Sequence, residues 1–362
     1  MPPKTVIHGI GTAVPDQWKY QKDILEFLID SKKFHATTAS ETKKRDDFLR
    51  AVYKGSMIEK RHITAPVFSD PILTEKNIRD TMKLHRDSGI SLAIEASHKA
   101  MIDAVVKKED IKKVIFVSST GLTVPGIESM LIEELGLTRD TMHCNIIFSG
   151  CAASITALTS AQEFCITNPE LKCLIVSLEM FSFHIGKGKG KEEAVPTSLF
   201  SDGCAAVVMS GEYGKKAEGK WVIEGNYSYL IPDSSTAIMV NLMDKGIVGT
   251  LESKLPSVIK KELPGFMKCY YSKFGIDHVD HWCIHPGGPA IIKAAQTSLD
   301  VPEEKLKHSW ECLKQYGNMG AATILFVLDR MRRYEASKTD DNMIMLAFGP
   351  GLWVESLFLI KQ

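Results

Sequence analysis

The chain has 362 residues, of which 44% are hydrophobic and 24% charged, a balance typical of a globular protein. Its 44 lysine and arginine residues equal its 44 aspartate and glutamate residues, so no excess charge indicates a nucleic-acid or membrane-surface partner. No apolar run reaches the roughly 20 residues of a membrane helix, the N-terminus lacks a secretory-signal pattern, and the eight cysteines show no disulfide spacing. We therefore expect a cytoplasmic protein with reduced thiols.

The first half of the sequence alternates short apolar strands with helical patterns. Strands are predicted at Thr5–Ile10, Lys113–Ser118, directly before Cys151, Leu174–Leu178 and Ala205–Met209. Helices are predicted at Ser91–Val106, around Ile127–Leu135 and directly after Cys151. This alternation favours a layered α/β fold with a mixed sheet.

The second half repeats this theme in the same order. Its predicted strands are Trp221–Ile231, His281–His285, Met343–Phe348 and Trp353–Leu359. Its predicted helices are Thr250–Phe274, Gly288–Leu299 and Asn318–Ala336. Because the stretch Gly211–Gly219 is rich in turn residues and lysine, we place a boundary there and predict two similar halves, residues 1–215 and 216–362.

One cysteine, Cys151, lies on the corner between an apolar run, Ile146–Phe148, and the helix that follows. Most cysteines of cytoplasmic proteins are inert packing residues, and this is one interpretation of Cys151. The other is a nucleophile, because the free N–H groups and the dipole of a helix N-terminus favour a thiolate and lower the thiol pKa. A nucleophile would also need a base or an ion partner from elsewhere in the chain.

A histidine, His285, ends a predicted strand and precedes the tight turn Pro286–Pro289. It is either a hydrogen-bonded turn histidine or a group at the edge of a sheet, where pockets of α/β proteins form. His281, Cys283 and His285 alternate onto one face of the strand, which would also suit a metal ion. No further ligand cluster accompanies them in the sequence, so we expect no metal site.

Three glycine-rich stretches contain the remaining candidates. Asn318 precedes a predicted helix, where it suits an N-cap and could also donate its amide N–H to a developing oxyanion; the two roles are compatible. Gly349–Gly351 is a rigid connector between two predicted strands. Gly186–Lys191 alternates glycine with lysine but lacks the Ser or Thr that completes a phosphate-binding loop, so we interpret it as a flexible loop.

Together these stretches resemble the type III polyketide synthases, the chalcone and stilbene synthase family of the thiolase superfamily. The resemblance runs nearly from end to end and is carried, in order, by IGTAVP, SMIEKRH, TGLTVPG, SLFSDGCAAVV, HPGGPAI, YGNMGAA and FGPGLWVE. The related fatty-acid initiation ketosynthases share the Cys–His–Asn order, but they typically have GNTSAAS where this chain has GNMGAAT and lack the GPG ending. The resemblance implies a thiolase-like fold of αβαβα layers built from two similar halves.

The resemblance also implies a catalytic triad. Cys151 would accept an acyl group from a coenzyme A thioester. His285 would hold Cys151 as a thiolate–imidazolium pair and donate to the thioester oxygen, and Asn318 would share this donor role when malonyl-CoA loses carbon dioxide and an enolate forms. Preorganised donors stabilise such an oxygen in a dry pocket. Since decarboxylation supplies the carbanion, the chemistry requires no metal, flavin or nicotinamide cofactor.

Further residues match the family's cavity. Phe200 matches the gatekeeper phenylalanine between the coenzyme A tunnel and the cavity, although a buried core phenylalanine is the plain alternative. Pro350 and Gly351 match the loop that shapes the cavity floor, and Val124 matches the residue that reaches into the cavity of the partner in a homodimer. Departures from the plant chalcone synthases occur at positions that widen or narrow the cavity, so its net volume does not follow from the sequence; these are Gly249, Gly320, Phe181, His184 and Val240.

Two groups of residues are candidates for binding coenzyme A. Arg50 and Lys54 are the basic residues nearest to the expected phosphate patch, although the alignment with the family slips by one residue there. The small residues of the turn after His285 would let the pantetheine arm approach the backbone; they are Gly287, Gly288 and Ala290.

These assignments predict an acyltransferase. It would load an acyl-CoA starter on Cys151, extend it with malonyl-CoA by decarboxylative Claisen condensation, and cyclise the product to a microbial pyrone, resorcinol or phloroglucinol. One alternative is a single-round β-ketoacyl synthase, and another is a non-catalytic thiolase-fold protein that only binds acyl-CoA. The expected partners are small-molecule coenzyme A thioesters and a second copy of the chain, with no nucleic acid and no membrane.

Overall fold

The computed structural model describes residues 3–30, 39–64, 77–185, 191–213, 217–243 and 246–362. The first half of the chain supplies five strands of the large sheet, β1 (Lys4–Ala13), β4 (Ile111–Ser118), β5 (Met142–Ile147), β6 (Lys172–Met180) and β7 (Asp202–Glu212). β4 lies parallel to β5 and β6, and β7 lies antiparallel to β6 and β1. β4, β6 and β7 are almost entirely buried, which explains their continuous apolar sequences.

The second half supplies four more strands, β8 (Trp221–Leu230), β11 (His281–Ile284), β12 (Asn342–Gly349) and β13 (Trp353–Lys361). β11 is parallel to β12, whereas β12 and β8 are both antiparallel to β13. Three residues of β1, Thr5–Ile7, pair with Trp221–Ile223 of β8 and join the two half-sheets. The strand order is therefore β11-β12-β13-β8-β1-β7-β6-β4-β5.

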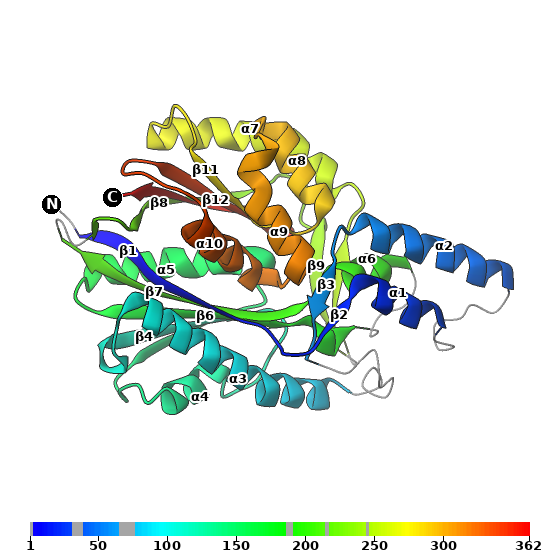
Figure 1. Ribbon diagram of the computed structural model, residues 1–362, viewed down its shortest axis with the longest axis horizontal. Coiled ribbons are helices and arrows are strands. Elements are labelled where there is room, and N and C mark those ends of the chain that lie inside the picture. Colours follow the sequence, from blue (N-terminus) through cyan, green and yellow to red (C-terminus); the bar gives the residue numbers. More distant parts are fainter. Residues whose placement is uncertain (1–2, 31–38, 65–76, 186–190, 214–216, 244–245) are drawn as a thin grey trace.

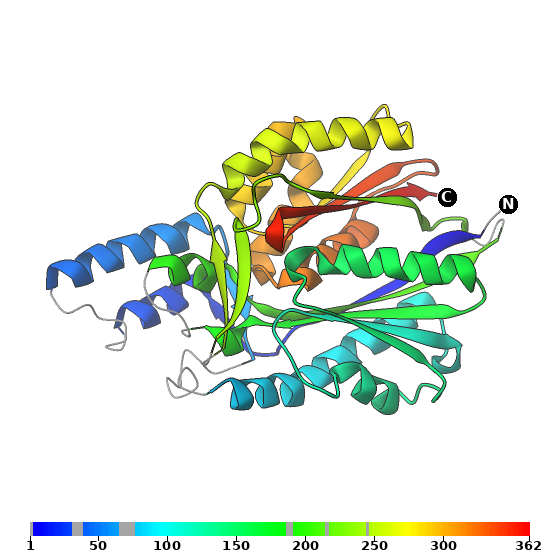
Figure 2. The same cartoon turned by 180° about the vertical axis from the view of Figure 1, so that it is seen from behind.

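The helices complete five layers (Figure 1). α5 (Ala153–Thr167) and α10 (Thr323–Tyr334) lie between the two half-sheets, which Figure 2 shows from the opposite side. α3 (Ile78–Ala104) and α4 (Ile127–Glu134) cover the outer face of the first half-sheet. α7 (Leu255–Phe274) and α8 (Pro289–Leu299) cover that of the second, with α9 (Lys307–Tyr316) beside α8 and α10. The predicted α/β fold with αβαβα layers is confirmed.

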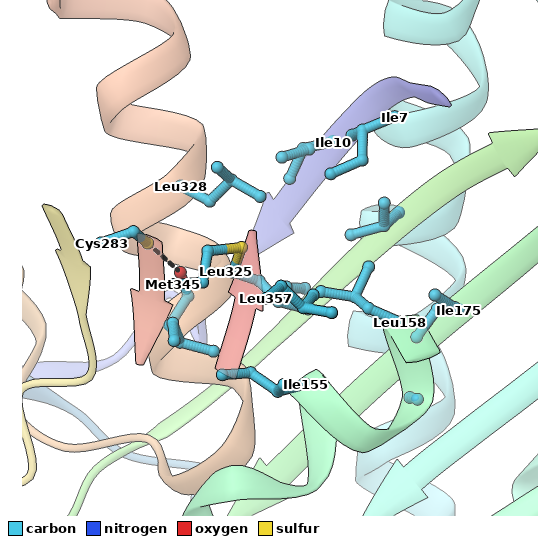
Figure 3. Close-up of a cluster of buried hydrophobic side chains, with 14 of the residues drawn as sticks. Ile7, Ile10, Ile155, Leu158, Ile175, Cys283, Leu325, Leu328, Met345 and Leu357 are labelled. Atoms are coloured by element: carbon cyan, nitrogen blue, oxygen red, sulfur yellow. Dashed lines mark hydrogen bonds between the residues drawn. The ribbon is translucent and has the colours of Figure 1, made fainter. Parts of the chain in front are cut away.

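The central layer belongs to both halves (Figure 3). Ile155 and Leu158 of α5 pack in one cluster with Leu325 and Leu328 of α10. The strand residues of this cluster come from both half-sheets and include five that are at most 2% exposed: Ile7, Ile10, Ile175, Met345 and Leu357. Because each such side chain contributes about 1.5–3 kcal/mol on burial, the two halves stabilise each other through α5 and α10.

A group of smaller elements lies at one end of the layers. They are β2 (Trp18–Tyr20), β3 (Lys60–His62), α1 (Gln21–Asp30), α2 (Ala39–Gly55), α6 (Lys191–Leu199), β9 (Ile238–Met243) and β10 (Gly246–Leu251). α1 and α2 project from the body at this end (Figure 1). The helix predicted at Thr250–Phe274 is wrong at its start, because Thr250 and Leu251 belong to β10.

Two predictions fall partly on residues outside the described ranges. The boundary between residues 215 and 216 lies within 214–216, and most of the glycine–lysine stretch lies within 186–190. In the part of the chain that the structure describes, no helix is both long enough and apolar enough to span a bilayer.

Candidate active site

Cys151 lies on a sharp corner between β5 and α5. Phe148 and Gly150 adopt left-handed backbone conformations, with φ of 57° and 64°, and Cys151 belongs to the short helix η4 (Gly150–Ala152) that leads into α5. A Cβ atom on Gly150 would lie 2.3 Å from Cδ of Pro350, so this position has room only for glycine. The predicted strand–turn–helix corner is confirmed.

The corner does not lower the pKa of the Cys151 thiol. Burial raises this pKa to about 12, and the negative charge of Glu179 acts in the same direction. A hydrogen bond from the side chain of Asn318 opposes the rise but does not cancel it. The predicted depression of the pKa is therefore wrong, because removal of the sulfur from water outweighs the dipole of the turn.

Asn318 makes hydrogen bonds through both ends of its side-chain amide. Its Oδ1 accepts a hydrogen bond from the backbone N–H of Gly320 (2.9 Å), the first residue of the short helix η8 (Gly320–Ala322). The N-cap residue of this helix is Met319, one position after the predicted one, and the role of Asn318 as an oxyanion donor stays a prediction. Its Nδ2 donates to the carbonyl of Gly287 (3.1 Å), and its side chain also hydrogen-bonds Cys151. Since Gly287 follows His285 by two residues, Asn318 holds the cysteine and histidine segments together.

His285 is buried with both ring nitrogens unpartnered among the described residues. Burial lowers its pKa to about 3, so the imidazole is neutral. Its backbone N–H donates to Leu346 of β12 (2.9 Å), which fixes the segment but leaves the ring uncommitted. A buried polar group without a partner is rare in folded proteins. The interpretation of His285 as a hydrogen-bonded turn histidine is therefore wrong, and the ring is available to a ligand.

His281 and Cys283, the other two residues of the face that would suit a metal ion, interact with groups of the protein. Nε2 of His281 lies 3.0 Å from Oδ2 of Asp341. Sγ of Cys283 donates to the carbonyl of Ile324 (3.7 Å), the contact dashed in Figure 3. Across the described ranges, no group of three or more His, Cys, Asp or Glu side chains is arranged to hold a metal ion.

The corners that carry Cys151 and Asn318 occupy equivalent places in the two halves. Each corner contains a short helix, η4 or η8, that leads into a helix of the central layer, α5 or α10, and that helix is followed by two antiparallel strands. Gly150 and Gly320 both have positive φ, 64° and 51°. The active-site corners are thus the same turn used twice, brought face to face by the shared central layer.

Two buried charged residues escaped the sequence analysis. Glu179 accepts hydrogen bonds from the backbone N–H of Ser119 (3.0 and 3.1 Å) and the hydroxyl of Thr120 (2.8 Å), and burial raises its pKa to about 8. Arg61 is fully buried and donates to the carbonyls of Thr197 (2.6 Å) and Phe200 (2.8 Å). Glu179 interrupts an otherwise apolar strand, a signal that could have identified it.

An apolar pocket of about 70 Å³ lies beside the triad. The predicted cavity residues that line it are Phe181, His184, Phe200, Val240 and Gly249. The rings of Phe181 and Phe200 stack with centroids 4.1 Å apart and planes 10° from parallel. The backbone of Phe200 forms a β-bridge with Asn318, which places the pocket next to the catalytic candidates.

The remaining cavity candidates lie outside this lining. A Cβ on Gly320 would lie 2.9 Å from the ring of Phe181, which therefore fills the space that a side chain there would take. Pro350 and Gly351 form the short helix η9 (Pro350–Leu352), packed against the Cys151 corner through Gly150. Val124 is 96% exposed and so does not contribute to the pocket of its own chain.

The predicted coenzyme A contacts are accessible in part. Arg50 and Lys54 are exposed on α2, where Arg50 makes an ion pair with Glu26 of α1 (2.9 Å). Gly287 is partly exposed, Gly288 is buried, and Ala290 is exposed in the first turn of α8. The two groups lie on different elements, and only the second adjoins His285 directly.

Family models and curated relatives match the chain along almost its whole length. The N-terminal domain of the chalcone and stilbene synthases matches residues 3–212, and the C-terminal domain of the same family matches residues 223–361. The chain is 30% identical to the alpha-pyrone synthesis polyketide synthase-like Pks18 of Mycobacterium tuberculosis, over 98% of this chain and 91% of that protein. It is 28% identical to type III polyketide synthase A of Arabidopsis thaliana, over 98% and 92%.

Solved structures show the same relationship. The crystal structure of PKS-I from the brown alga Ectocarpus siliculosus superposes with a TM-score of 0.93 at 28% identity, covering 100% of this chain and 99% of the other. The C-terminal type III polyketide synthase domain of Steely1 from Dictyostelium superposes with a TM-score of 0.89 at 26% identity, covering 99% of each. With both family domains matched along nearly its whole length, this chain belongs to the chalcone and stilbene synthase family and is a type III polyketide synthase.

Proposed function

We propose that Cys151 carries the growing acyl chain and that His285 and Asn318 act on the thioester and enolate oxygens. The observation that supports this assignment most directly is the buried imidazole of His285, whose nitrogens have no partner among the described residues. Asn318 stands between the histidine segment and the thiol, with hydrogen bonds to Gly287 and Cys151. A nucleophile, a base and an amide donor are the parts that acyl transfer needs.

Loading begins with two neutral groups. The Cys151 thiol gives its proton to His285, and the thiolate attacks the carbonyl carbon of the acyl-CoA. The imidazolium returns the proton to the leaving coenzyme A sulfur. Burial disfavours each separate charge, as the pKa values of about 12 for Cys151 and about 3 for His285 indicate. The attraction between thiolate and imidazolium offsets part of this cost, because opposite charges in contact interact strongly in a desolvated site.

Extension uses the same donors. Malonyl-CoA loses carbon dioxide, and the electron pair of the broken bond forms an enolate whose oxygen accepts hydrogen bonds from His285 and Asn318. The enolate carbon attacks the Cys151 thioester, a carbon–carbon bond forms, and the cysteine sulfur leaves as the thiolate. We propose that no metal or redox cofactor takes part. Phe200 gates the passage between the coenzyme A tunnel and the pocket, and Gly287, Gly288 and Ala290 admit the pantetheine arm.

The proposed product is a cyclised polyketide of the pyrone, resorcinol or phloroglucinol type. The name of the Mycobacterium tuberculosis relative refers to alpha-pyrone synthesis, which supports a pyrone in particular. We propose a homodimer in the cytoplasm in which Val124, 96% exposed, enters the cavity of the partner. Arg50 and Lys54 are proposed to meet the coenzyme A phosphates, for which Arg50 would exchange its ion pair with Glu26.

The first prediction concerns the nucleophile. Incubation with malonyl-CoA and a panel of acyl-CoA starters should release carbon dioxide and form a condensation product, and mass spectrometry should find an acyl group on Cys151. Cys151→Ala should lose the adduct and at least about 1,000-fold of product formation. The matched control is Cys269→Ala, at an exposed cysteine, which should keep both.

The product mass decides between this function and its alternatives. Two or more malonyl-derived units with ring closure support the polyketide synthase activity, whereas a single added unit would indicate one round of ketoacyl synthesis. An acyl adduct that survives in Cys151→Ala would refute the proposed nucleophile. Absence of any condensation across the panel would refute the proposed reaction.

A further inference from the structure

His184 connects one wall of the pocket to a buried segment that is distant in sequence. It ends the short helix η5 (Phe181–His184) and is 8% exposed. Its Nε2 lies 2.7 Å from the carbonyl oxygen of Thr120, and the backbone N–H of Ile247 in β10 points at its Nδ1 from 3.1 Å. Since His184 and Ile247 both line the pocket, the imidazole forms part of the pocket surface and also joins the β10 wall to Thr120.

The two contacts determine the state of the ring. A carbonyl oxygen only accepts hydrogen bonds, so Nε2 of His184 must carry the proton and donate to Thr120. A backbone N–H only donates, so Nδ1 must be the acceptor for Ile247. Both contacts are satisfied only by the neutral imidazole with its proton on Nε2. His184 is therefore a bridge with one donor end and one acceptor end.

The wall held by this bridge is the hairpin of β9 and β10, which contacts few other elements among the described residues. β10 pairs with β9 alone among the described strands, so its outer edge offers N–H groups to neighbours other than strands. The hairpin of β9 and β10 otherwise packs against α6, η5 and η9. Val240 of β9, together with Ile247, Val248 and Gly249 of β10, forms the pocket side of this hairpin. The position of β10 thus sets the width of the pocket.

Thr120, at the other end of the bridge, is held by several hydrogen bonds. The hydroxyl of Thr120 donates to Glu179 (2.8 Å) and accepts from the backbone N–H of Met180 (2.9 Å). Nε2 of His85 in α3 lies 3.1 Å from the same hydroxyl. Thr120 is fully buried. A hydrogen bond from His184 to its carbonyl therefore ties the edge of β10 to a buried, hydrogen-bonded segment directly after β4.

We infer that His184 is a positioning residue that fixes the β10 wall and thereby limits the size of the starter acyl group. The wall is held at a distance that leaves a pocket of about 70 Å³, about half of the 150 Å³ that admits a benzene ring in a dry protein cavity. The pocket suits a short straight aliphatic chain, and a longer or aromatic starter requires β10 to move outward. This inference rests on the proposed function, because it concerns the starter of that reaction.

Three variants separate the two ends of the bridge. His184→Phe keeps a ring of similar size but loses both hydrogen bonds. His184→Asn keeps an acceptor near the place of Nδ1, and His184→Gln keeps a donor near the place of Nε2. The control is His308→Phe, at a buried histidine of α9 paired with Glu335 (2.7 Å) and absent from the pocket lining. It reports general destabilisation only.

Two measurements test the inference. Hydrogen exchange followed by mass spectrometry should show faster exchange of residues 246–251 in His184→Phe and His184→Gln, but near wild-type exchange in His184→Asn and His308→Phe. Steady-state kinetics with acetyl-CoA, hexanoyl-CoA and lauroyl-CoA as starters should show a rise of about tenfold in the ratio of kcat/KM for lauroyl-CoA over acetyl-CoA in His184→Phe. A uniform loss of folded enzyme lowers both kcat/KM values equally and therefore leaves this ratio unchanged.

The outcomes are separable from those of the proposed function. Unchanged exchange in His184→Phe overturns the inference, and so does faster exchange with an unchanged starter ratio. If the wild-type protein condenses none of the three starters, the proposed function fails. The hydrogen-exchange measurement then still decides whether His184 holds β10, because it does not depend on catalytic turnover.

Discussion

At the scale of single residues, Gly249 and Gly320 show how similar substitutions have different consequences. The resemblance to the plant chalcone synthases implies a larger residue at both positions. At Gly249 the nearest atom of the described residues to an added Cβ is the carbonyl oxygen of Met239, 3.9 Å away. At Gly320 φ is 51°, and an added Cβ would lie 2.9 Å from the ring of Phe181 and 3.2 Å from Cγ of Glu179. Gly249 opens the pocket, whereas Gly320 leaves room for Phe181.

The second prediction follows from this difference. Gly320→Ala should lower the free energy of unfolding by about 1–3 kcal/mol, since the positive φ strains a side chain and the ring of Phe181 must move. The matched variant Gly249→Ala should change it by less than about 0.5 kcal/mol. Urea unfolding followed by circular dichroism measures both. Equal losses in the two variants would contradict the packing at Gly320.

At the scale of secondary-structure elements, α5 connects the nucleophile to the core. It begins directly after η4, which contains Cys151, and it contacts strands of both half-sheets. Ile155 and Leu158 are fully buried on its inner surface, whereas Ile166 near its end is 45% exposed. The orientation of the Cys151 corner therefore depends on how α5 packs between the half-sheets.

The third prediction compares two positions of this helix. Leu158→Ala should lower the free energy of unfolding by about 2–5 kcal/mol, because it leaves a cavity in the central layer. Ile166→Ala removes a similar side chain from an exposed site and should change it by less than about 0.5 kcal/mol. Thermal and urea unfolding provide the measurement. A cost at Ile166 comparable to that at Leu158 would show that α5 is not the shared layer described above.

At the scale of the whole molecule, buried titratable groups link stability to pH. Burial is the largest cause that lowers the pKa of His8, His85 and His285 to about 3 each, from 6.5 in the unfolded chain. Burial raises the pKa of Glu179 to about 8, from 4.5. These groups belong to β1, α3, the turn after β11, and β6. Because they are spread over the molecule, their protonation affects the stability of the whole fold.

The signs of these shifts predict a maximum of stability. Below about pH 6.5 the unfolded chain binds more protons at the three histidines than the folded chain does, so stability is lost as the pH falls towards 3. Between about pH 4.5 and pH 8 the folded chain binds more protons at Glu179, so that contribution is lost as the pH rises through about 8. We expect the urea midpoint to be highest near pH 6.5, with a decline on both sides.

The variant Glu179→Gln separates the acidic from the alkaline decline in stability. It removes the only carboxyl group among the four, so the decline above pH 6.5 should flatten while the decline on the acidic side remains. Unfolding midpoints measured in parallel for the two proteins test this expectation. An alkaline limb that is unchanged in the variant would exclude Glu179 as its source.

Much of the fold and of the site was predictable from the sequence. The strands β4, β6, β7, β11, β12 and β13 are apolar runs bounded by turn residues, and the predictions at these places are confirmed. The corner at Cys151 and the turn after β11 are encoded by neighbouring residues. By contrast, β9 and β10 have only six residues each, β9 is mostly exposed, and α2 is rich in charged residues. None of these segments therefore showed a clear apolar period in the sequence.

The sequence by itself determined which residues are the candidates for the chemistry, because the corner with Cys151, the turn with His285 and the glycine-flanked Asn318 are local patterns in a family-specific order. Only the tertiary structure decided their protonation. The pKa values of Cys151 and His285 depend on how much water the whole fold removes, and this depends on contacts between residues far apart in sequence. The same holds for the pocket, since Phe181, His184 and Ile247 meet there only when β10 closes on the central sheet.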